Sequence, residues 1–206
     1  MTRHPQFPLF PLALVALPGE EIRLHIFEQR YRTMIDECIA QEREFGIVWL
    51  AEDELKDVGC ACDVTSVLER MEDGRFNILA RATRPFRLLE RDNGLAYPAG
   101  TVEFVLDDEE DRDEVALLAA RETYAALVNA ATDEDPDPDE LAAMSAYAMA
   151  ATIEFGLEAR QRLLELRSEN ARLRLLTRLL RAAIRRLDFV DRAQARARSN
   201  GKVRFG

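Results

Sequence analysis

The sequence is poor in lysine, in cysteine and in long apolar runs, and each shortage excludes a class of protein. Only Lys56 and Lys202 are lysines, so nearly all of the positive charge is arginine. Three cysteines, an odd number, argue against a secreted disulfide scaffold. No apolar run reaches the ~18–20 residues that span a bilayer. The densest one, residues 141–155, is too short and follows an acidic run. We therefore predict a cytoplasmic protein without a membrane segment.

The composition is that of a folded globular protein. The chain has 206 residues, of which 48% are hydrophobic and 32% are charged, which suits one or two domains. Its net charge is -10. An acidic chain is a poor general binder of phosphate backbones, although a local basic patch remains compatible with this total.

Residues 7–37 begin as a secretory leader does, with an apolar run behind a basic end. Three prolines interrupt this run, and no A-x-A cleavage site follows it. The pattern instead predicts a strand at 9–17, a type II turn at Pro18-Gly19 and a second strand at 22–26. We therefore expect a hairpin that belongs to the mature fold.

The following segments predict one helix and then several strands. Apolar residues at helical spacing predict an amphipathic helix, with the stripe Phe27, Tyr31, Met34, Ile35 and Cys38. A short apolar strand is expected at 47–50. From residue 58 onward the pattern predicts a hairpin that turns at Asp73-Gly74, a strand that starts near Pro85 and another that ends at Leu106.

An acidic run at 107–114 marks a change to helices. Helices are predicted at 112–131, 141–155, 158–166 and 169–191, and the second, which has a single charge, is expected to be surrounded by the others. Strands followed by helices favour an α+β fold. We predict three parts: a β-rich domain at 1–107, a helical bundle at 108–191 and a flexible basic tail at 192–206.

The amino-terminal motifs resemble those of the Lon protease N-terminal, or substrate-binding, domain family. That family shows a P-L-F-P-L strand, an L-P-G turn and an L-H-I-F-E-x-R-Y-R segment. The "DGRFNILARATRPFRL" stretch is also similar to the family pattern, with Ala82 where glycine is usual. The matching segments are residues 8–12, 17–19, 24–32 and 59–64, and the resemblance extends over about residues 7–190.

The resemblance implies a PUA-like β-pseudobarrel followed by a helical bundle. It also implies capture of unfolded or tagged polypeptides, in partnership with an ATP-dependent protease or chaperone. The sequence contains no G-x-x-x-x-G-K-[ST] phosphate loop and no motif of the Ser-Lys catalytic dyad of Lon proteases. We therefore expect a non-catalytic module without a cofactor.

The cysteines and histidines offer a metal site as an alternative to core packing. Cys60 and Cys62 would share one face of a strand, but a metal takes about four ligands. Only Cys38, His4 and His25 are available to complete a set, and they lack ligand spacing. We predict that the cysteines are buried as small apolar residues, with redox chemistry as the other alternative.

The charged residues that follow His25 suggest chemistry or a partner surface. A dyad of His25 and Glu28 lacks a Ser or Cys nucleophile motif. We expect His25 to be a hydrogen-bonded residue that fixes strand to helix. Glu28, Arg30 and Arg32 are expected to form local ion pairs, each worth about 0–1 kcal/mol if exposed.

The charge runs are predicted to be mainly solvated. The acidic runs at 107–114 and 133–140 lack the spacing of a Ca²⁺ loop. Residues 178–204 contain nine Arg or Lys and two Asp. This end of the chain either contacts nucleic acid or an acidic partner, or simply complements the helix dipole. Its helical part places Arg178, Arg181 and Arg185 on one outer face.

The leading hypothesis is a module that binds unfolded polypeptide or degron segments through exposed apolar side chains. The candidate peptide-binding residues are Phe7, Phe10, Phe27 and Tyr31, since the proline-rich strand can leave aromatics accessible. The alternative is a PUA-like RNA-binding module that uses the Arg-rich end, and a small hydrolase is a third reading. A membrane partner is not expected.

Overall fold

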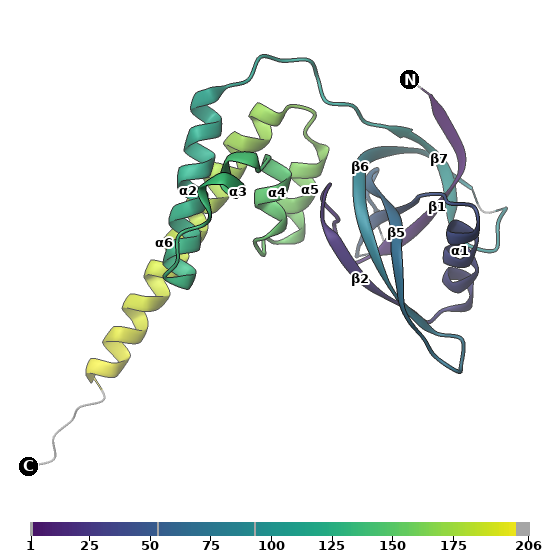
Figure 1. The fold of residues 1–206 in the computed structure, drawn as a ribbon, viewed down its shortest axis with the longest axis horizontal. Helices are drawn as coiled ribbons and strands as arrows, with labels where there is room; N and C mark the ends of the chain where they lie inside the picture. Colours follow the sequence, from purple (N-terminus) through teal and green to yellow (C-terminus); the bar gives the residue numbers. More distant parts are fainter. Residues whose placement is uncertain (1, 53, 93, 201–206) are drawn as a thin grey trace, which may run out of the picture. The chain divides into compact units, whose positions relative to one another are not determined.

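The computed structural model describes residues 2–52, 54–92 and 94–200, with side chains as far as Phe189. The chain divides into two compact units (Figure 1). Unit 1 combines Met1–Glu109 with Tyr147–Ser168, and unit 2 combines Glu110–Ala146 with Glu169–Gly206. Residues 147–168, expected in the helical domain, therefore group with the strands.

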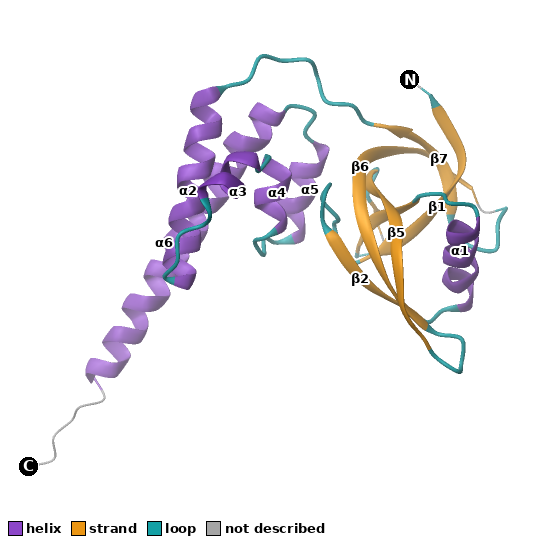
Figure 2. Ribbon diagram, viewed as in Figure 1, coloured by secondary structure: helices purple, strands orange, loops and turns teal. Residues whose placement is uncertain are grey.

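Unit 1 is built on a mixed, mainly antiparallel seven-stranded sheet (Figure 2). The path runs β1-β7-β6-β5-β3-β4, and β1 also pairs in parallel with β3, so the strands β1, β7, β6, β5 and β3 close into a ring. β2 pairs with β6 off this path. The strands are β1 (Arg3–Leu12), β2 (Glu21–Ile26), β3 (Phe45–Ala51), β4 (Glu54–Leu55), β5 (Val58–Arg70), β6 (Phe76–Asp92) and β7 (Ala99–Phe104).

The predicted amino-terminal hairpin is wrong, although its turn is confirmed. The Glu20 amide donates to the Leu17 carbonyl at 3.0 Å, and Gly19 has a φ of +89°, as a type II turn requires. The strands on either side do not pair with each other. Instead, β1 pairs with β3 and β7, and β2 pairs with β6, which all lie later in the chain.

The β5–β6 hairpin is confirmed, with Gly74 at a φ of +81° in its turn. Phe76, Ile78 and Ala80 are buried on one face of β6, as their alternation predicts. Pro85 does not start a new strand. It lies within β6, opposite Cys60 and beside the register shift between Cys60 and Cys62, where a missing amide is tolerated.

The core of unit 1 surrounds the ring of Phe86. Its members come from five strands: Phe7, Leu9, Val48, Ala61, Leu88 and Val102. The Phe7 and Phe86 rings meet edge to face, with centroids 5.4 Å apart. Gly46 and Gly59 leave room for the Phe86 ring, since a Cβ on either would lie 2.5 or 2.7 Å from it.

Helices complete unit 1. The apolar stripe of the first helix is confirmed for α1 (Gln29–Ala40), which buries Tyr31, Met34, Ile35 and Cys38; Phe27 precedes the helix. α4 (Ala146–Ala151) and α5 (Leu157–Glu165) follow later in the chain. The Gln161 side chain of α5 donates to the Val58 carbonyl at 3.0 Å, which ties α5 to β5.

Unit 2 is helical and contains α2 (Glu114–Thr132), α3 (Pro138–Ala143) and α6 (Glu169–Asn200). Its buried side chains include Ala120, Tyr124 and Leu127 of α2 and Leu173, Leu176 and Leu180 of α6. The predicted single helix at 141–155 is wrong, because Met144 is extended and separates α3 from α4. Nor does the last helix end at 191. It continues to Asn200, through most of the predicted tail, and residues 201–206 of that tail lie outside the described residues.

Candidate functional site

An apolar groove of unit 1 has a volume of about 550 Å³. This volume falls within the range of about 300–1,000 Å³ that is usual for ligand pockets. The strands β1, β2, β3, β4 and β6, the start of α1 and the loop before β7 all contribute side chains. The lining residues are Phe10, Pro11, Leu12, Leu24, His25, Phe27, Glu28, Arg30, Tyr31, Leu50, Leu55, Arg91 and Pro98.

The aromatic residues of this groove are held by one another. The rings of Phe10 and Tyr31 stack with centroids 4.2 Å apart, which joins β1 to α1. Phe27 stacks on His25 at 5.9 Å and is 58% exposed. Phe27 lies in the connection between β2 and α1, because α1 begins only at Gln29, and its side chain is therefore not packed under the helix.

Charged side chains form the rim of the groove. Arg30 and Glu28 pair at 2.9 Å, and the Arg30 guanidinium lies 4.6 Å from the centre of the Tyr31 ring. Burial raises the pKa of the Tyr31 hydroxyl, so this group stays neutral at physiological pH. Arg91 is exposed at the rim, and among the described residues no carboxylate pairs with it.

The predicted site residues divide between this groove and the core. Phe10, Phe27 and Tyr31 line the groove, but Phe10 and Tyr31 are as buried as Phe7, which packs against Phe86 and Phe104; of the four, only Phe27 is exposed. Phe7 and Phe10 differ because they lie three positions apart in β1, so that strand alternation directs their side chains to opposite faces. The sequence reasoning missed Leu12, Leu24, Leu50, Leu55 and Pro98. Of these, only Leu50 could have been found from the sequence, because it ends the apolar run of β3; in the structure it is the exposed end of that run.

A second groove, of about 530 Å³, lies at β2 and is more polar. His25 and Asn77 form a hydrogen bond at 2.7 Å, and the Asn77 amide donates to Glu69 at 3.1 Å. The expectation that His25 joins strand to helix is therefore wrong, since its partner lies on the neighbouring strand β6. The groove is also lined by Arg23, Leu24 and Leu68.

The charged residues of α1 form local contacts. Arg32 donates to the Asp73 carbonyl at 2.9 Å and to the side chain of Gln29. Arg32 thereby attaches α1 to the turn of the β5–β6 hairpin. Together with the Arg30–Glu28 pair, this contact agrees with the predicted structural role of the cluster.

The cysteines lie in the interior rather than at a site. Cys38, Cys60 and Cys62 are buried and unpaired, as predicted. Burial raises the pKa of the Cys38 thiol to about 11 and raises that of Cys60 and Cys62 further. In the part of the chain that the structure describes, His, Cys, Asp and Glu form no cluster of three suited to a metal ion.

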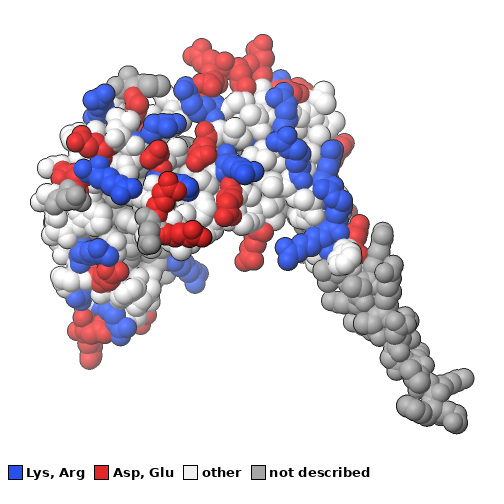
Figure 3. All heavy atoms as spheres, turned by 180° about the vertical axis from the view of Figure 1, so that it is seen from behind, with Lys and Arg blue, Asp and Glu red and all other residues white. Residues whose placement is uncertain are grey.

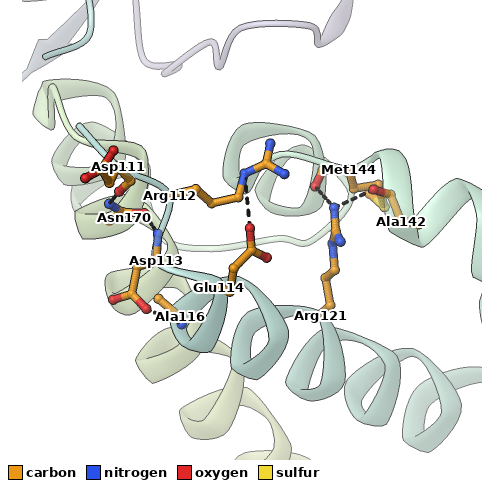
Figure 4. A network of polar contacts seen from close by, with 9 residues as sticks. All are labelled: Asp111, Arg112, Asp113, Glu114, Ala116, Arg121, Ala142, Met144 and Asn170. Atoms are coloured by element: carbon orange, nitrogen blue, oxygen red, sulfur yellow. Dashed lines mark hydrogen bonds and ion pairs between the residues drawn. The ribbon is translucent and has the colours of Figure 1, made fainter. Parts of the chain in front are cut away.

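Unit 2 has a cavity of about 360 Å³ near the start of α2 (Figure 4). Arg112 and Arg121 line it together with Glu110 and Glu169, so that opposite charges balance. Most of its polar groups cap helices. Arg121 donates to the Ala142 and Met144 carbonyls at the end of α3, and the Glu169 carboxylate accepts from the Ala146 amide at 2.7 Å. These contacts give the cavity a structural role.

Arginines are aligned along one face of α6. Arg174, Arg178, Arg181 and Arg185 are exposed, at spacings of three or four residues. Figure 3 shows Lys and Arg side chains in a column on this unit. Arg174 pairs with Asp113, which accounts for the first of the four. The predicted outer face of Arg178, Arg181 and Arg185 is confirmed, whereas its proposed partner stays a prediction.

An apolar groove with one exposed aromatic side chain, Phe27, lies on the closed sheet and suits a binding module. The chain belongs to the family of the ATP-dependent protease La (Lon) substrate-binding domain, whose model matches residues 6–182. The matched family is that of the substrate-binding part and not of a catalytic part, which agrees with the expectation of a non-catalytic module. In the described residues no helix is long and apolar enough to cross a membrane.

Two solved structures resemble the chain. The Lon N-terminal domain protein from Xanthomonas campestris is 26% identical, with a TM-score of 0.64. The N-terminal domain of the Mycobacterium avium complex Lon protease is 21% identical, with a TM-score of 0.65, and shows the same fold. Each comparison covers 85% of this chain and 97% of the other.

Proposed function

We propose that the chain binds unfolded or tagged polypeptides through the groove of about 550 Å³ and so serves protein quality control or proteolysis. The observation that carries this proposal is the exposure of Phe27 and Leu50, 58% and 42%, at the wall of an apolar groove. Large apolar side chains that stay exposed around a hollow mark a surface for apolar partners. The membership of the substrate-binding family supports the same conclusion.

The partner chemistry follows from the lining. Nine of the lining residues are apolar or aromatic: Phe10, Pro11, Leu12, Leu24, Phe27, Tyr31, Leu50, Leu55 and Pro98. A segment of an unfolded chain offers apolar side chains that a folded protein hides. An ATP-dependent protease or chaperone is the partner that would act on such a client. The alternative of RNA binding gains nothing from this groove, which lacks a row of cations.

The test is binding of reduced, carboxymethylated casein, an unfolded protein, followed by fluorescence anisotropy. We expect the double variant Phe27→Ala, Leu50→Ala to lose at least about tenfold in affinity, since aromatic anchors dominate such interfaces. Both side chains are exposed, so the fold should survive.

The matched control is Leu106→Ala, Val115→Ala, which removes two apolar side chains that are 68% and 80% exposed outside the groove. Equal affinity of the groove variant and this control would contradict the proposal, as would a wild-type protein that binds no casein.

A further inference from the structure

The strand β2 has one paired edge and one open edge. All six of its residues are in register with β6, from Glu21 opposite Arg81 to Ile26 opposite Phe76. On the other edge, no strand or loop of the described chain forms a backbone hydrogen bond with β2. At about 3.3 Å per residue, this edge offers roughly 20 Å of unpaired backbone donors and acceptors.

The two grooves of unit 1 meet at this strand. Leu24 and His25, whose side chains alternate between the two faces of β2, line both of them, so the grooves adjoin at β2. The larger groove is mainly apolar, with Phe27, Leu50 and Leu55 in its wall. The second carries Arg23, Glu69 and Asn77. Side chains of an added strand would alternate between these faces, because strand geometry has a period of two.

Two arginines near the strand can bind carboxylates of a partner. Arg91 lines the larger groove and Arg23 the second, and neither has a carboxylate partner among the described residues. Arg30 and Glu28 neutralise each other. The second groove also contains Glu69, whose carboxylate accepts from the Asn77 amide. A client segment with carboxylates complements both arginines.

We propose that an extended client segment of about five or six residues pairs with the open edge of β2 as an additional strand. Its apolar residues enter the larger groove, its alternate polar residues face Asn77 and Glu69, and carboxylates at its ends meet Arg23 and Arg91. This binding mode rests on the proposed function and names the substrate class: unfolded, acidic segments of alternating polarity.

The test compares N-methylated forms of one peptide, the fluorescein-labelled octamer Glu-Val-Thr-Val-Thr-Val-Thr-Glu. In an antiparallel or parallel strand, alternate amides face one neighbour. Methylation of one alternate set should therefore abolish binding, and methylation of the other set should change the affinity less than about twofold. Hydrogen exchange of the β2 amides should slow when the peptide is added.

Four outcomes overturn strand addition while leaving groove binding intact: equal effects of the two methylated sets, no effect of either set, unchanged exchange in β2, or casein binding without octamer binding. If the wild-type protein binds neither casein nor the octamer, the proposed function is overturned as well. A dimer that forms through β2 and excludes the octamer, detected by sedimentation, also overturns the proposal.

A charge variant gives an independent readout. Arg91→Glu should weaken octamer binding about fivefold at low salt, with a smaller difference at 0.5 M salt, where charges are screened. Arg87→Glu is the matched control, because Arg87 is exposed on the same strand but lines neither groove. Equal loss in both variants contradicts the proposed role of Arg91.

Discussion

Arg160 shows how a single charged side chain holds unit 1 together. It is only 7% exposed, and its Nε donates to the Val15 carbonyl at 2.9 Å. Its guanidinium also pairs with the carboxylate of Glu20, which accepts in turn from the Leu17 amide at 3.0 Å. The segment between β1 and β2 thus gains its shape from a residue in α5, more than a hundred positions later in the sequence.

Glu20→Gln should lower the free energy of unfolding by roughly 2–4 kcal/mol, because it leaves a buried guanidinium without its counter-charge. Urea denaturation measures this loss. Glu54→Gln is the control, since it removes the exposed partner of Lys56 and should cost about 0–1 kcal/mol. Equal urea midpoints for the two variants would show that the buried ion pair stabilises the fold no more than the exposed one.

Among the helices, α2 has a start that is fixed by one residue, its N-cap Asp113. Its side chain accepts from the Ala116 amide at 3.0 Å and pairs with Arg174 of α6. The hydrogen bond to the Ala116 amide, reinforced by Arg174, lowers the pKa of the Asp113 carboxyl. Charge at this position is therefore favoured in the folded protein.

Asp113→Ser keeps a helix cap but removes the charge, so its stability should fall below the wild type at neutral pH. Since the folded-state pKa is lowered, the contribution of the charge is present above the ordinary Asp range and disappears as the pH falls through the folded pKa. Urea midpoints of the two proteins should therefore converge on acidification. A constant difference at all pH values would disagree with this mechanism.

Gly59 lets β5 approach β3 over the core. A Cβ at this position would lie 2.5 Å from the Ile47 carbonyl oxygen and 2.7 Å from the Phe86 ring. Gly59→Ala should therefore destabilise unit 1 by about 1–3 kcal/mol through overpacking. Gly156→Ala, where the nearest atom is 3.8 Å away, is the matched control in a thermal melt. Equal melting temperatures would mean that β5 moves aside without cost.

Elements with local causes could be predicted from the sequence, and those with distant causes could not. The stripe of α1 and the Gly74 turn depend on neighbouring residues, and both are confirmed. After the break between α3 and α4, the Ala146 amide donates to Glu169, a residue of α6 that lies 23 positions later. The pairing of β2 with β6 likewise joins residues fifty or more positions apart, which no local pattern reports.

At the scale of the whole molecule, unit 1 is built from two separate segments of the chain. Tyr147–Ser168 returns to unit 1 after the first half of unit 2 has been formed by Glu110–Ala146. Leu163 and Leu164 of this returning segment are almost fully buried. The contacts of Arg160 and Gln161 also come from this segment, so the strands alone lack part of their support.

An isolated chain of residues 1–109 should therefore melt at a lower temperature than the full chain and bind a hydrophobic dye such as ANS. A chain in which a Gly/Ser linker replaces residues 110–146, ending at residue 168, is the control and should regain a cooperative melt. Circular dichroism measures both. A cooperative, dye-free melt of residues 1–109 would contradict the requirement for α5.

The candidate site was predictable only in part, since a groove is a property of several elements. The sequence indicated Phe7, Phe10, Phe27 and Tyr31 because the proline-rich strand can leave aromatics accessible. The last three line the groove, and of these only Phe27 is exposed. Their role in peptide binding stays a prediction. Leu55 and Arg91 come from β4 and β6, and only the closed sheet brings them to the same wall.

The construction of unit 1 from two separate segments has a consequence for synthesis on the ribosome. A growing chain that has reached Glu109 must lengthen by 59 residues, from 109 to 168, before the last segment of unit 1 exists. At about 5–20 residues per second, that interval is roughly 3–12 seconds. During this interval the carbonyls of Val15 and Val58 lack the hydrogen bonds that Arg160 and Gln161 donate in the folded protein. The nascent strands are then open to chaperones, and codon choice between residues 110 and 168 should affect the yield of folded protein.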